Sequence, residues 1–120
     1  MDATLYGIVN CDTVKKARAW LDAHRMPYAF VDLKKPAFTP AALDRWIAAL
    51  GWEPLVNRSG MTWRKLDDAA RAGVVDRASA RALMLAAPAV IKRPVVEWPD
   101  GHITAGFKPD EFAARTPKRG

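Results

Sequence analysis

The first third of the chain alternates between short apolar runs and one amphipathic segment. Residues 3–9 carry β-branched and aromatic side chains in loose alternation, which predicts a strand. Residues 12–24 have helical spacing of apolar positions, and Pro27 ends this helix because proline cannot continue it. The apolar positions of this helix are Val14, Ala17 and Leu21. Residues 28–32 resemble the first strand, and a strand, a helix and a strand in about 30 residues predict a βαβ unit with parallel strands.

Further helices are expected in the middle of the chain. The first begins after Thr39, a favourable N-cap residue, and ends at Gly51. Its apolar residues share one face and are expected to lie in the core: Leu43, Trp46, Ile47 and Leu50. A second helix is expected from a Thr62 cap to Gly73, and a third, rich in alanine and leucine, covers residues 77–87.

The last third has the pattern of a hairpin followed by a short helix. Residues 95–98 and 102–107 are suited to strands, and Pro99-Asp100-Gly101 between them is a turn signal. Two strands joined by such a turn predict an antiparallel hairpin. A short helix is then expected over residues 109–115.

This order of elements predicts an α/β fold. A βαβ unit joined through a helix to ββα is the connectivity of a thioredoxin-like fold, here a glutaredoxin-type four-stranded mixed sheet with a helical insertion at 53–87. Residues 1–116 are expected to form one domain, and residues 117–120 a basic tail. In this topology Cys11 follows the first strand, where α/β folds bind their ligands.

Composition and charge narrow the classes of function. The apolar content is 50%, which favours a folded globule, and no apolar run or leader pattern suggests a membrane span or export. A cytoplasmic protein is therefore expected. The net charge of +6 raises the question of nucleic acid, but Arg115, Lys118 and Arg119 supply half of it. The other basic residues alternate with acidic ones, so a nucleic-acid partner is not expected.

Cys11 is the single cysteine, and it lies at the corner between the first strand and the first helix. A thiol at a helix N-terminus has its thiolate stabilised by the free backbone N–H groups and the helix dipole. One cysteine forms no internal disulfide, which fits a reducing compartment. Position alone leaves open a reactive thiol or a buried residue without chemistry. His24 and His102 lack metal-ligand spacing, so no metal is expected.

Three separated motifs occur in order along the chain: Tyr6–Arg18; Asn57 with Gly60 and Thr62–Leu66; and Ile91–Pro94. Together they resemble the ArsC family, more narrowly its Spx/YffB-type branch, over about residues 3–112. The resemblance implies a thioredoxin-like fold with a helical insertion. It also implies that Cys11 is the nucleophile, that Arg93 is its catalytic partner, and that Pro94 is a cis-proline facing the cysteine. The substrate-binding residues that it suggests are Asn10, Asp12, Thr13, Lys15, Arg58 and Pro94.

The chain departs from the arsenate-reducing members at several positions. Arg58 lies one place from the family's loop arginine, and Gly106-Phe107 stands where a later arginine is expected. Val14 replaces the serine three places after the nucleophile, although Thr13 is retained. A depleted set of guanidinium groups binds a multiply charged oxyanion poorly, because bidentate arginine contacts supply both geometry and charge. Glutaredoxin-coupled arsenate reduction is therefore the alternative function, not the leading one.

The absence of a Cys-x-x-Cys pair indicates that an outside thiol must resolve any mixed disulfide on Cys11. Glutathione is the expected co-substrate, and no bound cofactor is expected. The YffB-like relatives are described as probable glutathione-dependent thiol reductases, and the resemblance implies the same activity here. A third hypothesis is an Spx-like regulator that binds a protein such as RNA polymerase, although that branch normally uses a Cys-x-x-Cys switch.

Overall fold

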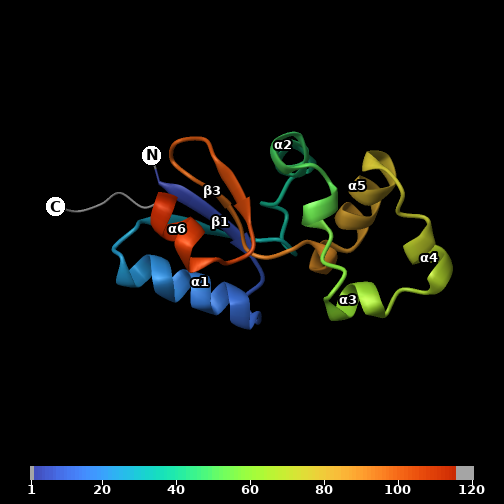
Figure 1. Cartoon of the computed structure of the whole chain (residues 1–120), viewed down its shortest axis with the longest axis horizontal. Helices are drawn as coiled ribbons and strands as arrows, with labels where there is room; N and C mark the ends of the chain where they lie inside the picture. The colour runs from blue at the N-terminus through green and yellow to red at the C-terminus, as the bar shows by residue number, and fades with distance from the viewer. Residues whose placement is uncertain (1, 116–120) are drawn as a thin grey trace. The chain divides into compact units, whose positions relative to one another are not determined.

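The computed structural model describes residues 2–115, which divide into two compact units (Figure 1). The first unit, which we call the sheet unit, consists of the residues up to Asp32 and those from Arg93 onward. Leu33–Lys92 build the second, which we call the helical unit. The prediction of a single domain with an insertion at 53–87 stays a prediction, and the tail predicted at 117–120 lies outside the described residues.

The sheet unit contains a four-stranded mixed sheet within residues 2–115, in the order β2-β1-β3-β4. Its elements are β1 (Ala3–Gly7), α1 (Asp12–Ala23), β2 (Tyr28–Asp32), β3 (Val95–Glu97), β4 (Ile103–Ala105) and α6 (Pro109–Arg115). Strands β1 and β2 are parallel, whereas β3 is antiparallel to both β1 and β4. The predicted βαβ unit and hairpin are therefore confirmed, and so is the thioredoxin-like arrangement. The first strand ends at Gly7, two residues earlier than its apolar pattern suggests.

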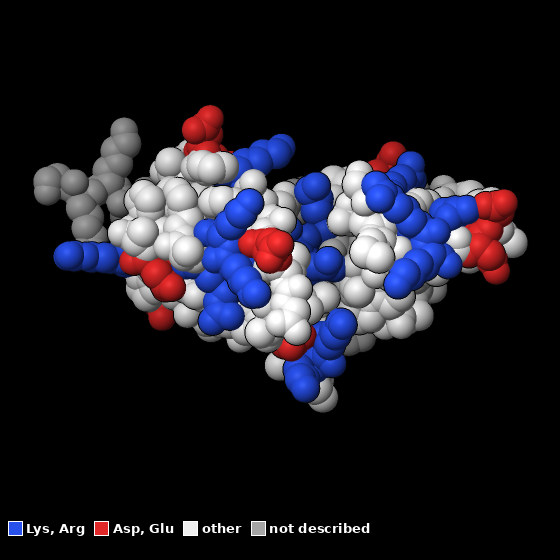
Figure 2. Space-filling view, turned by 90° about the horizontal axis from the view of Figure 1, so that it is seen from below, with Lys and Arg blue, Asp and Glu red and all other residues white. Residues whose placement is uncertain are grey.

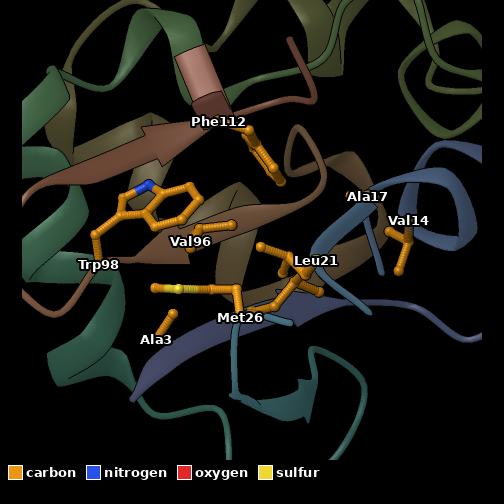
Figure 3. Packing of buried hydrophobic residues seen from close by; sticks show 9 residues of the cluster. Ala3, Val14, Ala17, Leu21, Met26, Val96, Trp98 and Phe112 are labelled. Carbon is orange, nitrogen blue, oxygen red and sulfur yellow. The ribbon is translucent and has the colours of Figure 1, made fainter. Parts of the chain in front are cut away.

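Helices α1 and α6 cover the same face of this sheet (Figure 3). The predicted stripe of α1, which is Val14, Ala17 and Leu21, is fully buried against Leu5 and Val96 of the strands. Phe112 of α6 is the centre of an aromatic cluster: the rings of Trp20, Trp98 and Phe107 meet it edge-on, with centroids 5.6, 5.0 and 4.9 Å away. The Trp98 indole Nε1–H is buried but donates to Thr104 Oγ1 at 2.9 Å. Trp98 is therefore part of the core of the sheet unit.

The helical unit is built from short helices, and α2, α4 and α5 each begin with a side-chain cap. Its elements are α2 (Pro40–Leu50), η1 (Glu53–Leu55), α3 (Met61–Arg64), α4 (Asp68–Ala72), α5 (Arg77–Ala86) and η2 (Pro88–Val90). Thr39 caps α2 by accepting a hydrogen bond from the Ala42 N–H, as expected. The predicted apolar face of α2 is confirmed, because Leu43, Trp46 and Ile47 are buried and Leu50 is half-buried.

One predicted helix is wrong. Instead of a single helix from Thr62 to Gly73, α3 begins after Gly60 and is followed by a separate α4. The cause is Asp67, whose backbone is extended and whose carboxylate accepts a hydrogen bond from the Ala70 N–H at 2.7 Å. An aspartate in this role starts a new helix instead of continuing the previous one. Within residues 2–115, no helix has both the length and the apolar character that spanning a bilayer requires.

Candidate active site

The corner that holds Cys11 is shaped by a close approach of β1 to α1. Gly7 ends β1, and a Cβ atom built on it would lie 2.8 Å from Val14 Cγ2, so this position has room only for glycine. Cys11 is the N-cap of α1, with extended backbone angles of φ −123° and ψ 119°. Its carbonyl oxygen accepts the Lys15 N–H at 2.9 Å. The half-buried side chain of Cys11 is thereby fixed at the start of the helix, where the backbone N–H groups are unpaired.

Opposing effects act on the thiol of Cys11. Burial of the sulfur raises its pKa, whereas the Val14 backbone N–H, the hydrogen bond and positive charge of Arg93, and the Thr13 backbone N–H lower it. The balance is a pKa below the ordinary value of a cysteine. The thiolate is the nucleophilic form of cysteine, so these donors increase the reactive fraction at neutral pH. The geometry thus favours a reactive thiol over a buried residue without chemistry.

Arg93 reaches Cys11 from the segment that leads into β3. The Arg93–Pro94 peptide bond is cis, as the resemblance implies, and Pro94 is buried. The Pro94 carbonyl accepts a hydrogen bond from the Gly106 N–H at 2.8 Å, and Gly106 has φ 89°. A positive φ favours glycine, so the residue that stands where an arginine is expected instead anchors the proline segment through its backbone.

The other predicted site residues fall into two groups. The first group flanks Cys11 in the sheet unit with exposed side chains: Asn10, Asp12, Thr13 and Lys15. Of these residues only Thr13 donates to the thiolate, through its backbone N–H. Arg58 lies in the helical unit, where its guanidinium carbon stands 5.6 Å from the ring centre of Trp63. The substrate-binding roles of all of them stay predictions.

Sequence reasoning missed three features of these segments. The close approach at Gly7 and the backbone anchor at Gly106 carry no local signal beyond a glycine. The stacking of Arg58 on Trp63 joins residues five apart across the end of a loop, which no helical spacing indicates. The two histidines have ordinary partners: His24 stacks on Trp20 with ring centres 3.6 Å apart, and His102 Nδ1 lies 2.9 Å from Asp100 Oδ2.

Comparisons with known proteins identify the family of this chain. The model of the ArsC family matches residues 6–115. The chain belongs to the ArsC family. An uncharacterised protein from Haemophilus influenzae is 36% identical over 111 residues, which cover 92% of this chain and 96% of the relative.

Two solved structures are similar along almost the whole chain. The structure named YFFB protein is 50% identical, with a TM-score of 0.88, and the match covers 96% of this chain and 99% of that one. An arsenate reductase (ArsC) related protein from Brucella melitensis is 51% identical, with a TM-score of 0.75 and coverage of 95% and 93%. The thioredoxin-like fold and the YffB-like resemblance are confirmed. Membership of the ArsC family supports thiol-based reduction as the general class of chemistry.

Proposed function

We propose that this protein is a thiol–disulfide oxidoreductase that uses Cys11 as its single nucleophile and glutathione as its co-substrate. The observation that carries this proposal is the set of donors on one sulfur: a guanidinium and two backbone N–H groups lower the pKa of Cys11 against the effect of its burial. A thiolate held in this way attacks disulfide sulfurs faster than an ordinary thiol does at neutral pH.

The first step is exchange with a mixed disulfide between glutathione and a second thiol. The Cys11 thiolate attacks the glutathione sulfur, forms a Cys11–glutathione disulfide, and releases the second thiol as its thiolate. The Arg93 guanidinium and the Val14 and Thr13 N–H groups lower the pKa of Cys11 and so favour its ionisation before the attack. The step needs no further oxidant or reductant, because the Cys11 sulfur is oxidised from thiolate to disulfide while the released sulfur is reduced from disulfide to thiolate.

The second step needs an external thiol, because the chain has one cysteine. A glutathione thiolate attacks the glutathione sulfur of the adduct, which forms oxidised glutathione and frees Cys11 as the thiolate. In sum, one mixed disulfide and one glutathione become one free thiol and oxidised glutathione. The low pKa of Cys11 makes it a good leaving group in this step, since thiols of lower pKa leave faster.

Arsenate reduction with glutaredoxin is the second candidate. It is supported by the same donors, since a guanidinium beside unpaired N–H groups at the start of a helix is suited to an oxyanion. The argument against it is charge: Arg93 is the one guanidinium among the groups that act on Cys11, and Gly106 supplies only backbone. We therefore place arsenate second.

The test is mass spectrometry of the intact protein after exposure to oxidised glutathione. We expect one glutathione adduct on Cys11, its removal by reduced glutathione, and no adduct on Cys11→Ser. A coupled assay then follows turnover of a glutathionylated peptide, with arsenate plus glutaredoxin as a separate arm. Failure to form the adduct would exclude the proposed activity. Turnover of arsenate without turnover of the glutathionylated peptide would reverse the order of the two candidates.

A further inference from the structure

The helical unit contains a cavity of about 610 Å³ that the proposed function does not use. It lies between the segment that follows β2 and the end of α5. Its wall is mostly apolar and includes Leu33, Phe38, Leu85 and Pro88. The charged residues in this wall are both basic, Lys34 and Lys35, and no acidic residue of the described chain lines it. The volume is within the range of about 300–1,000 Å³ that is typical of small-molecule sites.

The wall of this cavity is held in place by buried contacts. Phe38 is buried and stacks on Trp46 of α2, with ring centres 5.4 Å apart and planes 16° apart. The Phe38 N–H donates to the Lys35 carbonyl at 3.1 Å, which fixes the turn between the basic residues and the apolar wall. The Ile91 N–H donates to the carbonyl of Pro88, another wall residue, at 3.1 Å. These contacts fix the positions of Phe38 and Pro88 in the wall.

Charge selects the kind of ligand. Residues 33–92 carry ten Lys and Arg against five Asp and Glu, and basic side chains are spread over the helical unit at the right of Figure 2. An anion is attracted to such a unit from a distance. The carbonyl groups at the C-terminal end of α5 carry partial negative charge, so the part of the wall at Ala87 disfavours an anionic group. The anionic group is accordingly assigned to Lys35.

We propose that this cavity binds an amphipathic carboxylate, with an aliphatic or aromatic body against Leu85 and Phe38 and the carboxylate beside Lys35. A neutral apolar molecule would not use the positive charge of Lys35, and a multiply charged anion would leave the apolar wall in contact with water or with charge. The ligand class follows from the combination of one apolar wall and one basic edge. Cys11 is not part of this binding site, since the wall belongs to the helical unit.

The test uses dodecanoate below its micelle concentration, followed by titration calorimetry and by amide NMR spectra of the full chain. We expect one site per chain, with shifts confined to residues around the cavity. Lys35→Glu should weaken binding by about fivefold, the effect of one exposed ion pair. Lys65→Glu is the matched control, because Lys65 is exposed in the same unit, lies outside the cavity wall, and changes the net charge equally.

Two further arms make the proposal falsifiable. Leu85→Trp fills the cavity and should abolish binding, whereas dodecyltrimethylammonium, with the same chain length and a positive head, should not bind. Thermal unfolding and alkylation of Cys11 show that each variant is folded. Equal binding of the cation, unchanged binding by folded Leu85→Trp, or equal losses in Lys35→Glu and Lys65→Glu would overturn the proposal. Binding of an acidic apolar peptide without binding of dodecanoate would overturn it as well.

Discussion

The proposed chemistry and most of the net positive charge of this protein belong to different units. Cys11, which we propose as the nucleophile, Arg93 and the cis-proline all belong to the sheet unit. The helical unit carries a net charge of +5 from its sequence, whereas the rest of the chain carries nine basic and eight acidic residues, a net +1. The basic composition of the chain therefore says little about the pKa of Cys11. The groups that lower the pKa of Cys11 are one side chain and two backbone N–H groups nearby, not the overall charge.

The units also differ in the range of their stabilising contacts. In the sheet unit β1 pairs with β3, about ninety residues later, and α1 shares its core with α6. In the helical unit much of the order is local: Thr39, Asp67 and Asp76 each accept a hydrogen bond from a backbone N–H three residues later. Local signals can be recognised in a sequence, whereas the geometry at Cys11 depends on contacts between distant segments. We therefore expect substitutions in the sheet-unit core to affect both stability and reactivity.

The largest expected effect is from Phe112→Ala in the sheet unit. Phe112 is fully buried among three aromatic rings, so its removal should lower the free energy of unfolding by about 3–5 kcal/mol, measured by urea denaturation. Phe107→Ala is the matched control, because Phe107 belongs to the same cluster but is only half-buried. Equal losses from the two substitutions would contradict the central place of Phe112 in this core.

Gly7→Ala should have the next largest effect, and it tests the difference between the two units most directly. The new Cβ would lie 2.8 Å from Val14 Cγ2, so the Val14 side chain or α1 itself must shift, at a cost of about 1–3 kcal/mol. A shift of α1 would move its N–H groups relative to Cys11. We expect slower alkylation by iodoacetamide together with lower stability. In the helical unit, Gly73→Ala meets only ordinary contacts at 3.4 Å or more, and its φ is −75°. Gly73→Ala should leave the stability unchanged or raise it slightly. Equal losses of stability in Gly7→Ala and Gly73→Ala would contradict the steric argument.

Arg93→Met should change the pH dependence of Cys11 alkylation. The Arg93 charge and hydrogen bond favour the thiolate, so their loss raises the pKa of Cys11 and moves the midpoint of the rate profile upward. The folded-state pKa is lowered, so ionisation contributes stability that is complete above the unfolded value, about 8.5, and is lost as the pH falls through the folded value. The variant should lose part of that contribution. Lys15→Met is the control, since Lys15 is not among the groups that lower this pKa, and an equal shift there would show a general charge effect.

Much of the fold could be predicted because its signals are local. The apolar spacing at Val14, Ala17 and Leu21, the Thr39 cap and the turn at Pro99–Gly101 identify elements without any knowledge of their partners. The helix expected from Thr62 to Gly73 was wrong for a local reason too: Asp67, followed by Asp68 and two alanines, is itself a cap signal that outweighs continuity.

The site was less accessible to sequence reasoning. Cys11 at a strand–helix corner could be recognised, because the helix N-terminus is a local feature. The part played by Gly106 could not, since it depends on a hydrogen bond to Pro94 across the hairpin and on a positive φ. The family resemblance suggests Arg58 as a substrate-binding residue from its chain position, whereas its contact with Trp63 follows from side-chain packing in the helical unit. Such contacts depend on the folded chain.

The smallest expected effect lies on the surface of the helical unit, in the pair formed by Arg81 of α5 and Asp44 of α2. Arg81 Nε and one terminal nitrogen contact the two carboxylate oxygens at 2.7 and 3.2 Å, but both side chains remain well exposed. Exposed pairs contribute little and are screened by salt. A double-mutant cycle with Arg81→Met and Asp44→Asn should therefore show a coupling much smaller than the loss in Phe112→Ala, and high salt should reduce it further.

The pair of Arg81 and Asp44 also predicts a pH dependence of stability that is separate from the ionisation of Cys11. The Arg81 hydrogen bond is the main reason that the pKa of Asp44 is lowered, so the pair's contribution is complete above the ordinary aspartate pKa and is lost as the pH falls through the lowered value. Thermal unfolding at acid and neutral pH measures this loss in the wild type and in Arg81→Met. The alkylation profile of Cys11 should be the same in both, because the groups that lower its pKa all belong to the sheet unit. A shifted profile in Arg81→Met would mean that a charge in the helical unit affects the ionisation of Cys11. The reactivity of Cys11 would then not depend on the sheet unit alone.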